Sequence, residues 1–169
     1  MRRTPGRHAA IIPTRIAPAI DSKSRPSSTI SSTLLTPSSN SVEAIGRTPV
    51  LSVASELRFT KQGVLPGEHA RSIAERTQDL LRGPVVAGLH SLAAASLASG
   101  KADGDALVCG DDTEAKELAL ALAALVVSGR ALDAGPLASA RALEGLTAVI
   151  VNLNKRYRAH AGVQVTGLH

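Results

Sequence analysis

The chain has 169 residues, a single cysteine and an aromatic content of 1%, so any core must be built from Ala, Leu, Val and Ile. The lone Cys109 excludes an internal disulfide framework and a cysteine-based zinc site, and the shortage of rings counts against recognition of single-stranded nucleic acid by base stacking. The longest apolar run, residues 118–127, is about half the length that a bilayer-spanning helix needs, which predicts a soluble, cytoplasmic protein with no membrane partner.

The net charge of +5 comes from one end of the chain. Residues 1–49 carry seven Lys or Arg against two acids, whereas residues 50–169 carry twelve of each. A basic recognition surface on a folded domain would not divide in this way. Nucleic-acid binding is therefore the weakest of the functional readings.

Residues 1–46 are rich in Ser, Pro and Arg, and five prolines interrupt any helix there. Such a segment buries too little apolar surface to offset the entropy of ordering it. We expect a disordered arm or an artefact of the assigned start. Because the segment is Arg- and Ser-rich and poor in acids, a targeting peptide is the alternative.

From residue 47 onward, short apolar runs alternate with helical segments. Strands are predicted over residues 50–54, 85–89, 106–109, 130–133 and 163–167, and helices over residues 66–82, 92–98, 113–127 and 136–158. Residues 59–63 are expected to form a loop. The alternation predicts an α/β fold with mostly crossover connections.

Several helices carry recognisable signals. Asp111, three residues before Glu114, is typical of a capping box, and Ser91 is placed to cap the helix that follows it, residues 92–98. The apolar face predicted for the long last helix consists of Leu143, Leu146, Ile150, Leu153 and Tyr157.

The motifs of several enzyme classes are missing. The sequence contains no Gly-x-Gly-x-x-Gly, no Walker-type Gly-Lys-Ser/Thr and no Gly-x-Ser-x-Gly elbow. Neither a catalytic side chain nor a metal site is predicted.

Four candidate groups for chemistry each have a structural alternative. His90 directly follows a strand, where ligands bind in open α/β sheets, and the alternative is a hydrogen-bonded structural histidine. Asp111 and Asp112 resemble a paired-carboxylate or metal site, but a helix cap explains them better, and Cys109 is most simply a small buried apolar residue. The cations of residues 155–158 (KRYR) suit the last turn of a helix, with contact to an anion as the alternative.

Three stretches taken together resemble one known family. They are residues 85–91 (VVAGLHS), 108–112 (VCGDD) and 132–141 (LDAGPLASAR), followed by residues 146–147 (LT), 152–157 (NLNKRY) and 160–162 (HAG). Their order and spacing resemble the C-terminal part of the NADPH-dependent coenzyme F-420 reductases.

The resemblance implies an oxidoreductase that passes a hydride between NADP(H) and the deazaflavin coenzyme F-420. In that family a Rossmann domain holds NADP, and a smaller C-terminal α/β domain seats the deazaflavin against the nicotinamide, so that catalysis is mostly positioning. By this resemblance, His90, Leu92 and Ala94 lie at the nicotinamide end, and Ala161 and Gly162 line the deazaflavin pocket.

The family's glycine fingerprint should lie upstream of residue 50, and residues 1–46 do not resemble it. We therefore expect a truncated reductase with impaired NADP binding. Its parts would be a disordered arm (1–46), a remnant of the Rossmann-type sheet (47–83) and a small C-terminal α/β domain with one long helix (84–169). The alternative is a non-catalytic α/β interaction domain, and pairing of the long helix with a second copy is expected to give a homo-oligomer.

Overall fold

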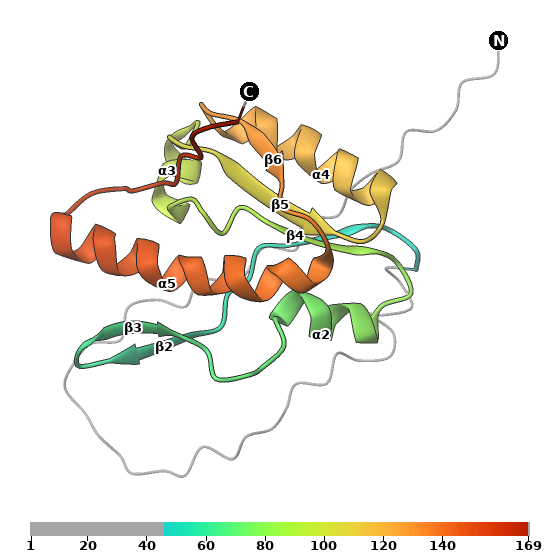
Figure 1. Cartoon of the computed structure of the whole chain (residues 1–169), viewed down its shortest axis with the longest axis horizontal. Coiled ribbons are helices and arrows are strands. Elements are labelled where there is room, and N and C mark those ends of the chain that lie inside the picture. The colour runs from blue at the N-terminus through green and yellow to red at the C-terminus, as the bar shows by residue number, and fades with distance from the viewer. Residues whose placement is uncertain (1–45, 169) are drawn as a thin grey trace.

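The computed structural model describes residues 46–168, so the segment expected to be a disordered arm lies almost wholly outside the described residues. Figure 1 shows a mixed α/β architecture, which confirms the predicted fold class. The elements are β1 (Val50–Ser52), β2 (Leu57–Thr60), β3 (Gly63–Pro66), α2 (Ile73–Leu80), β4 (Val85–Gly88), α3 (Ala94–Ser99), β5 (Ala106–Gly110), α4 (Thr113–Val126), β6 (Ala131–Asp133) and α5 (Ala140–Tyr157), with a short 3-10 helix, Leu137–Ser139, before α5. Within residues 46–168, none of the helices has the length and hydrophobicity to cross a membrane.

The main sheet has the strand order β1-β4-β5-β6. β1 pairs with β4 and β5 pairs with β6 in parallel, but β4 and β5 are antiparallel, with Ala87 opposite Cys109. The expectation of mostly crossover connections is thus wrong at the centre of the sheet. The six-residue α3 extends only about 9 Å, which is too short to carry the chain back along the sheet, so β5 enters from the end where β4 leaves.

Helices cover both faces of this sheet (Figure 1). On one face Val86 and Val108 pack against α4, whose contact residues are alanines four residues apart. On the other face Val85, Ala87 and Cys109 pack against α2 and the start of α5. Adjacent strand residues therefore point to opposite cores, as the alternation of side chains along a strand requires.

The segment between β1 and α2 differs from the sequence-based prediction. Residues 57–66 form an antiparallel hairpin, β2–β3, instead of a loop at residues 59–63. The helix predicted from residue 66 begins only at Ile73, because Ser72 and Glu75 form a capping box there.

Three further local predictions are corrected. Ser91 caps no helix and instead donates to the carbonyl oxygen of Asp105 at 2.8 Å, and α3 has no side-chain cap. Asp112, not Asp111, caps α4 by accepting from Ala115 N at 2.9 Å. Residues 163–167 form no strand.

The apolar face predicted for α5 is buried only in part. Leu143 and Ile150 are buried, but Leu153 and Tyr157 are 38% and 68% exposed. The last two turns of α5 extend beyond the main sheet, as Figure 1 shows. Residues 155–157 at the end of the helix are exposed.

Candidate functional site

A cavity of about 590 Å³ lies where the chain leaves β1 and β4 and passes α5. Its wall is mainly aliphatic and rich in alanine. The lining residues are Val53, Ala54, Ser55, Leu57, Leu89, His90, Leu92, Ala93, Ala94, Ala95, Leu97, Thr147, Ile150, Val151, Asn154 and His160. This volume, with an apolar wall and a few polar groups, is typical of a small-molecule site.

The turn after β4 positions one wall of the cavity. Leu89 adopts φ +66°, a conformation that side-chain-bearing residues rarely adopt outside sites where the fold requires it. The Leu92 N–H closes the turn on the Leu89 carbonyl oxygen at 3.2 Å, and the bond from the Ser91 hydroxyl joins it to Asp105, the residue before β5. His90 and Leu92 are thereby fixed side by side at the carboxyl end of β4.

His90 is buried, and its two ring nitrogens have different surroundings. Nε2 lies 3.1 Å from the carbonyl oxygen of Ala54, so Nε2 carries the proton and donates. Nδ1 is buried without a partner among the described residues. Burial lowers the pKa of His90, which keeps the ring neutral and leaves Nδ1 as an unsatisfied acceptor beside the cavity.

The opposite wall carries further polar groups, Thr147 and Asn154 on α5 and Ser55 between β1 and β2. Thr147 donates to the carbonyl oxygen of His90 at 3.2 Å, and the hydroxyls of Ser55 and Thr147 lie 2.8 Å apart. Asn154 Oδ1 accepts from Ala161 N at 2.6 Å, which holds the segment after α5 against the helix. Its Nδ2 has no acceptor among residues 46–168, which leaves an amide donor on this wall.

The five residues expected to contact coenzyme are divided between two places. His90, Leu92 and Ala94 line the cavity together. Ala161 and Gly162 do not line it; His160 does so in their place. Gly162 packs against the carbonyl oxygen of Asp103 so closely that a Cβ would collide with it, so its lack of a side chain serves packing. Ligand contact by these five residues stays a prediction.

Sequence reasoning missed four polar residues of this cavity: Ser55, Thr147, Asn154 and His160. Three of them lie within the short stretches that carry the family resemblance, at residues 146–147, 152–157 and 160–162. That position was the only available signal, because nothing in their spacing relates them to residue 90.

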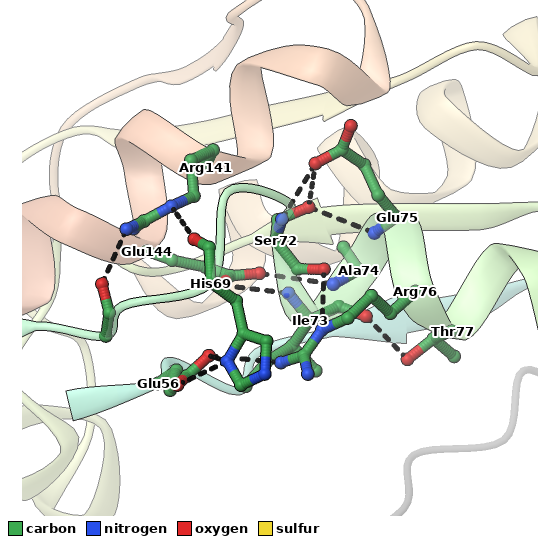
Figure 2. A network of polar contacts seen from close by, with 11 residues as sticks. Glu56, His69, Ser72, Ile73, Ala74, Glu75, Arg76, Thr77, Arg141 and Glu144 are labelled. Atoms are coloured by element: carbon green, nitrogen blue, oxygen red, sulfur yellow. Dashed lines mark hydrogen bonds and ion pairs between the residues drawn. The ribbon is translucent and has the colours of Figure 1, made fainter.

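A second cluster of charged residues is accounted for by structural roles. Figure 2 shows Glu144 of α5 accepting from the Ile73 and Ala74 amides at 3.0 and 3.1 Å, while Arg141 donates to the carbonyl oxygen of His69 at 2.9 Å. Glu144 is almost fully buried, and burial raises the pKa of its carboxyl. These contacts fasten the start of α2 to α5.

The same network extends to the loop before α2. The Glu56 carboxylate accepts a hydrogen bond from His69 Nδ1 at 2.7 Å and forms an ion pair with the Arg76 guanidinium at 3.1 Å. The hydrogen bond from His69 lowers the pKa of the Glu56 carboxyl. No group of three or more His, Cys, Asp or Glu side chains within residues 46–168 is arranged to hold a metal ion.

Known proteins that match this chain carry the same name, F420-dependent NADP reductase. No family model matches the chain. Curated proteins named F420-dependent NADP reductase do match: the protein from Methanocaldococcus jannaschii is 35% identical over 101 residues, and the one from Methanothermobacter thermautotrophicus is 37% identical over 103 residues, each covering 57% of this chain. The chain spans less than half of these relatives' length, 45% and 44% respectively.

The solved structures agree at the level of the fold. A protein from Arthrobacter sp. FB24 assigned as an F420-dependent NADP reductase superposes with a TM-score of 0.62 and 22% identity, covering 77% of this chain and 61% of its own. The names of these relatives imply NADP and coenzyme F420 as their cofactors or substrates. The chain is thus similar in sequence and fold to the F420-dependent NADP reductases, over a part of their length.

Proposed function

We propose that the cavity between the β4–α3 turn and α5 binds the deazaflavin ring of coenzyme F420, and that the chain acts in hydride exchange between this coenzyme and NADP(H). One observation carries the proposal. Three of the five residues that the family resemblance assigned to the coenzymes, His90, Leu92 and Ala94, line one cavity of about 590 Å³. The resemblance places them at the nicotinamide end, against which the deazaflavin ring would stack. The match to curated proteins named F420-dependent NADP reductase supports the same coenzyme.

The cavity suits a flat tricyclic ring. Ala93, Ala94 and Ala95 present no side chain beyond Cβ, so a ring can approach the backbone closely. The aliphatic side chains of the wall offer few groups that bind water. The unpaired Nδ1 of His90 is a buried polar atom that lacks a donor, which a ligand N–H would satisfy.

The bound coenzyme would supply the chemistry, since a deazaflavin accepts or releases a hydride. The residues of this chain supply position and environment. Asn154 and Ser55 offer a donor and an acceptor for the polar edge of a ring. His90 stays neutral next to the bound ring, because burial lowers the pKa of the imidazole. This side chain therefore does not protonate the coenzyme.

The described residues do not fit the pyrophosphate of NADP in the same way. After β1 the chain passes through residues 53–56 into the β2–β3 hairpin, and no glycine-rich turn followed by a helix stands there to cradle a phosphate. We therefore propose that the described residues hold the deazaflavin, and we assign none of them to binding the pyrophosphate of NADP.

A second candidate function is that of an interaction domain. Val149, Leu153 and Tyr157 lie four residues apart along α5 and are 51%, 38% and 68% exposed. Such a stripe favours contact with a partner helix, including that of a second copy. Homo-oligomerisation through α5 therefore stays a proposal.

Equilibrium titration with coenzyme F420, followed by the emission of the deazaflavin, tests the first function. Saturable binding of one coenzyme per chain is expected. Absence of binding, together with a concentration-dependent dimer in sedimentation, would support the interaction domain instead. A parallel titration with NADPH is expected to show markedly weaker binding.

A further inference from the structure

A second cavity lies on the other side of α5. It has a volume of about 630 Å³ and opens between the turn of the β2–β3 hairpin and the last turns of α5. Its lining residues are Lys61, Gln62, Gly63, Val149, Asn152, Leu153, Lys155, Arg156 and Tyr157. None of them lines the cavity proposed for the deazaflavin. We call this second cavity the hairpin groove.

Specific contacts fix the two sides of the hairpin groove relative to each other. The Asn152 side chain binds Val64 on both sides: its Nδ2 donates to the Val64 carbonyl oxygen at 2.7 Å, and the Val64 N–H donates to Oδ1 at 2.8 Å. The turn itself is fixed by Thr60, whose hydroxyl donates to the Gly63 carbonyl oxygen at 2.8 Å. Figure 1 shows the hairpin running beside α5. The site is therefore formed before any ligand arrives.

The charges around the hairpin groove are all positive. Lys61 comes from the turn, and Lys155 and Arg156 come from α5, with no acidic residue in the lining. None of the three forms an ion pair with another residue in the part of the chain that the structure describes. The helix dipole accounts for cations in the last turn of α5, but it does not account for Lys61, which another element brings to the same place.

One wall of the hairpin groove is apolar. Leu153 and the ring of Tyr157 stand exposed there, one turn apart on α5. An exposed tyrosine ring beside an arginine is a surface on which a planar group can stack. Gln62 adds amide groups at the rim.

We propose that the hairpin groove binds a phosphorylated small molecule that carries an aromatic ring, such as a nucleoside phosphate. The phosphates would lie against Lys61, Lys155 and Arg156, and the ring against Tyr157 and Leu153. A second copy of the chain fits less well, because a two-fold contact here would bring the cations of both copies together. This site is separate from the proposed deazaflavin site, so each can fail without the other.

The composition of the chain provides a direct reporter. Tyr157 is the only tyrosine and there is no tryptophan, so the intrinsic tyrosine emission of the full chain comes from the hairpin groove. ADP is expected to quench this emission saturably. Adenosine and pyrophosphate, which each offer half of the recognised chemistry, are expected to bind at least about tenfold more weakly, since a charge-assisted contact is lost in one case and stacking in the other.

Two sets of variants locate the effect. The double variant Lys155→Gln/Arg156→Gln and the single variant Lys61→Gln should each weaken ADP at least about tenfold, with unchanged thermal unfolding because these side chains are exposed. Lys101→Gln, which removes an exposed cation outside the hairpin groove, should leave the affinity unchanged. Absence of saturable quenching by ADP, equal affinity for pyrophosphate and ADP, or wild-type affinity in Lys61→Gln would each overturn the proposal.

Discussion

The side chain of Asn152 takes the place of a neighbouring strand for Val64. It accepts from the Val64 amide at 2.8 Å and donates to the Val64 carbonyl oxygen at 2.7 Å. The β2–β3 hairpin lies outside the main sheet, and these two bonds join it to α5. One helix is thus in contact with the proposed deazaflavin cavity on one side and with the hairpin groove on the other.

Asn152→Leu removes both of these bonds and leaves the two backbone groups of Val64, a buried residue, without partners. The loss of these two hydrogen bonds should lower the free energy of unfolding by about 1–3 kcal/mol. Hydrogen exchange should show faster exchange of the Val64 amide. Asn152→Asp keeps the acceptor, so protection of that amide should largely persist. Unchanged protection in Asn152→Leu would contradict this role.

Two glycines in contact with these elements should respond in opposite directions to alanine. Gly63 has φ +137°, and a Cβ there would lie 2.8 Å from Asn152 Oδ1, so Gly63→Ala should destabilise the chain by about 1–3 kcal/mol. Gly145 lies inside α5, where a Cβ would meet only the Pro66 ring at 3.7 Å, so Gly145→Ala should stabilise by about 0.5–1 kcal/mol. Urea unfolding of both variants measures the change in the free energy of unfolding. A change of the same sign in both would contradict the geometry.

Asp105 should make stability depend on acidic pH. Hydrogen bonds from the backbone and side chain of Arg130 and from the Val165 amide lower the pKa of this carboxyl to about 2. An unfolded aspartate titrates near pH 4, so the ionised group stabilises the fold above about pH 4, and this contribution is lost as the pH falls towards about 2.

The corresponding variant is Asp105→Asn. It should lower the thermal unfolding midpoint at pH 7, and its difference from wild type should shrink between about pH 4 and pH 2. Asp103→Asn changes an exposed neighbour and serves as the matched control, with a small effect at either pH. A difference for Asp105→Asn that does not change with pH would show that the carboxylate is not the stabilising group.

Cys109 should be chemically inert in the folded chain. It is fully buried between β4 and the helices, and burial raises the pKa of its thiol to about 11. Since the thiolate is the reactive form, labelling by iodoacetamide at pH 8 should be much slower without urea than in urea. The chain has one cysteine, so the signal has one source. Rapid labelling of the native chain would contradict the packing of this sheet.

The main sheet was predictable from sequence because its strands are short apolar runs between turn residues. The runs at residues 50, 85, 106 and 131 all form strands. The β2–β3 hairpin was not predicted, since its side chains are largely exposed, Phe59 to 75%, and its anchor is an asparagine far along the chain. The predicted start of α2 at residue 66 is too early, because Pro66-Gly67 is typical of a helix start but the capping box at Ser72 sets the first turn.

Residues 163–167, after α5, show a different limit of prediction from sequence. The alternation of residues 163–167 is typical of a strand, but the backbone there binds the Asp105 carboxylate and amide instead of a neighbouring strand. In the site, His90 was found because it follows a strand. Ser55 and Asn154 were not found, because only the tertiary fold brings residues so far apart in the sequence to one cavity.

The central claim, that the cavity beside His90 holds a deazaflavin ring, is tested most directly on α3. Ala94 lines the cavity, whereas Ala98 is exposed on the same helix and does not line it. Titration of coenzyme F420 into wild type, Ala94→Trp and Ala98→Trp should give equal affinities for wild type and Ala98→Trp and at least about tenfold weaker binding for Ala94→Trp, because the indole fills ring space. Equal affinity in all three proteins, or no binding to wild type, would contradict the claim.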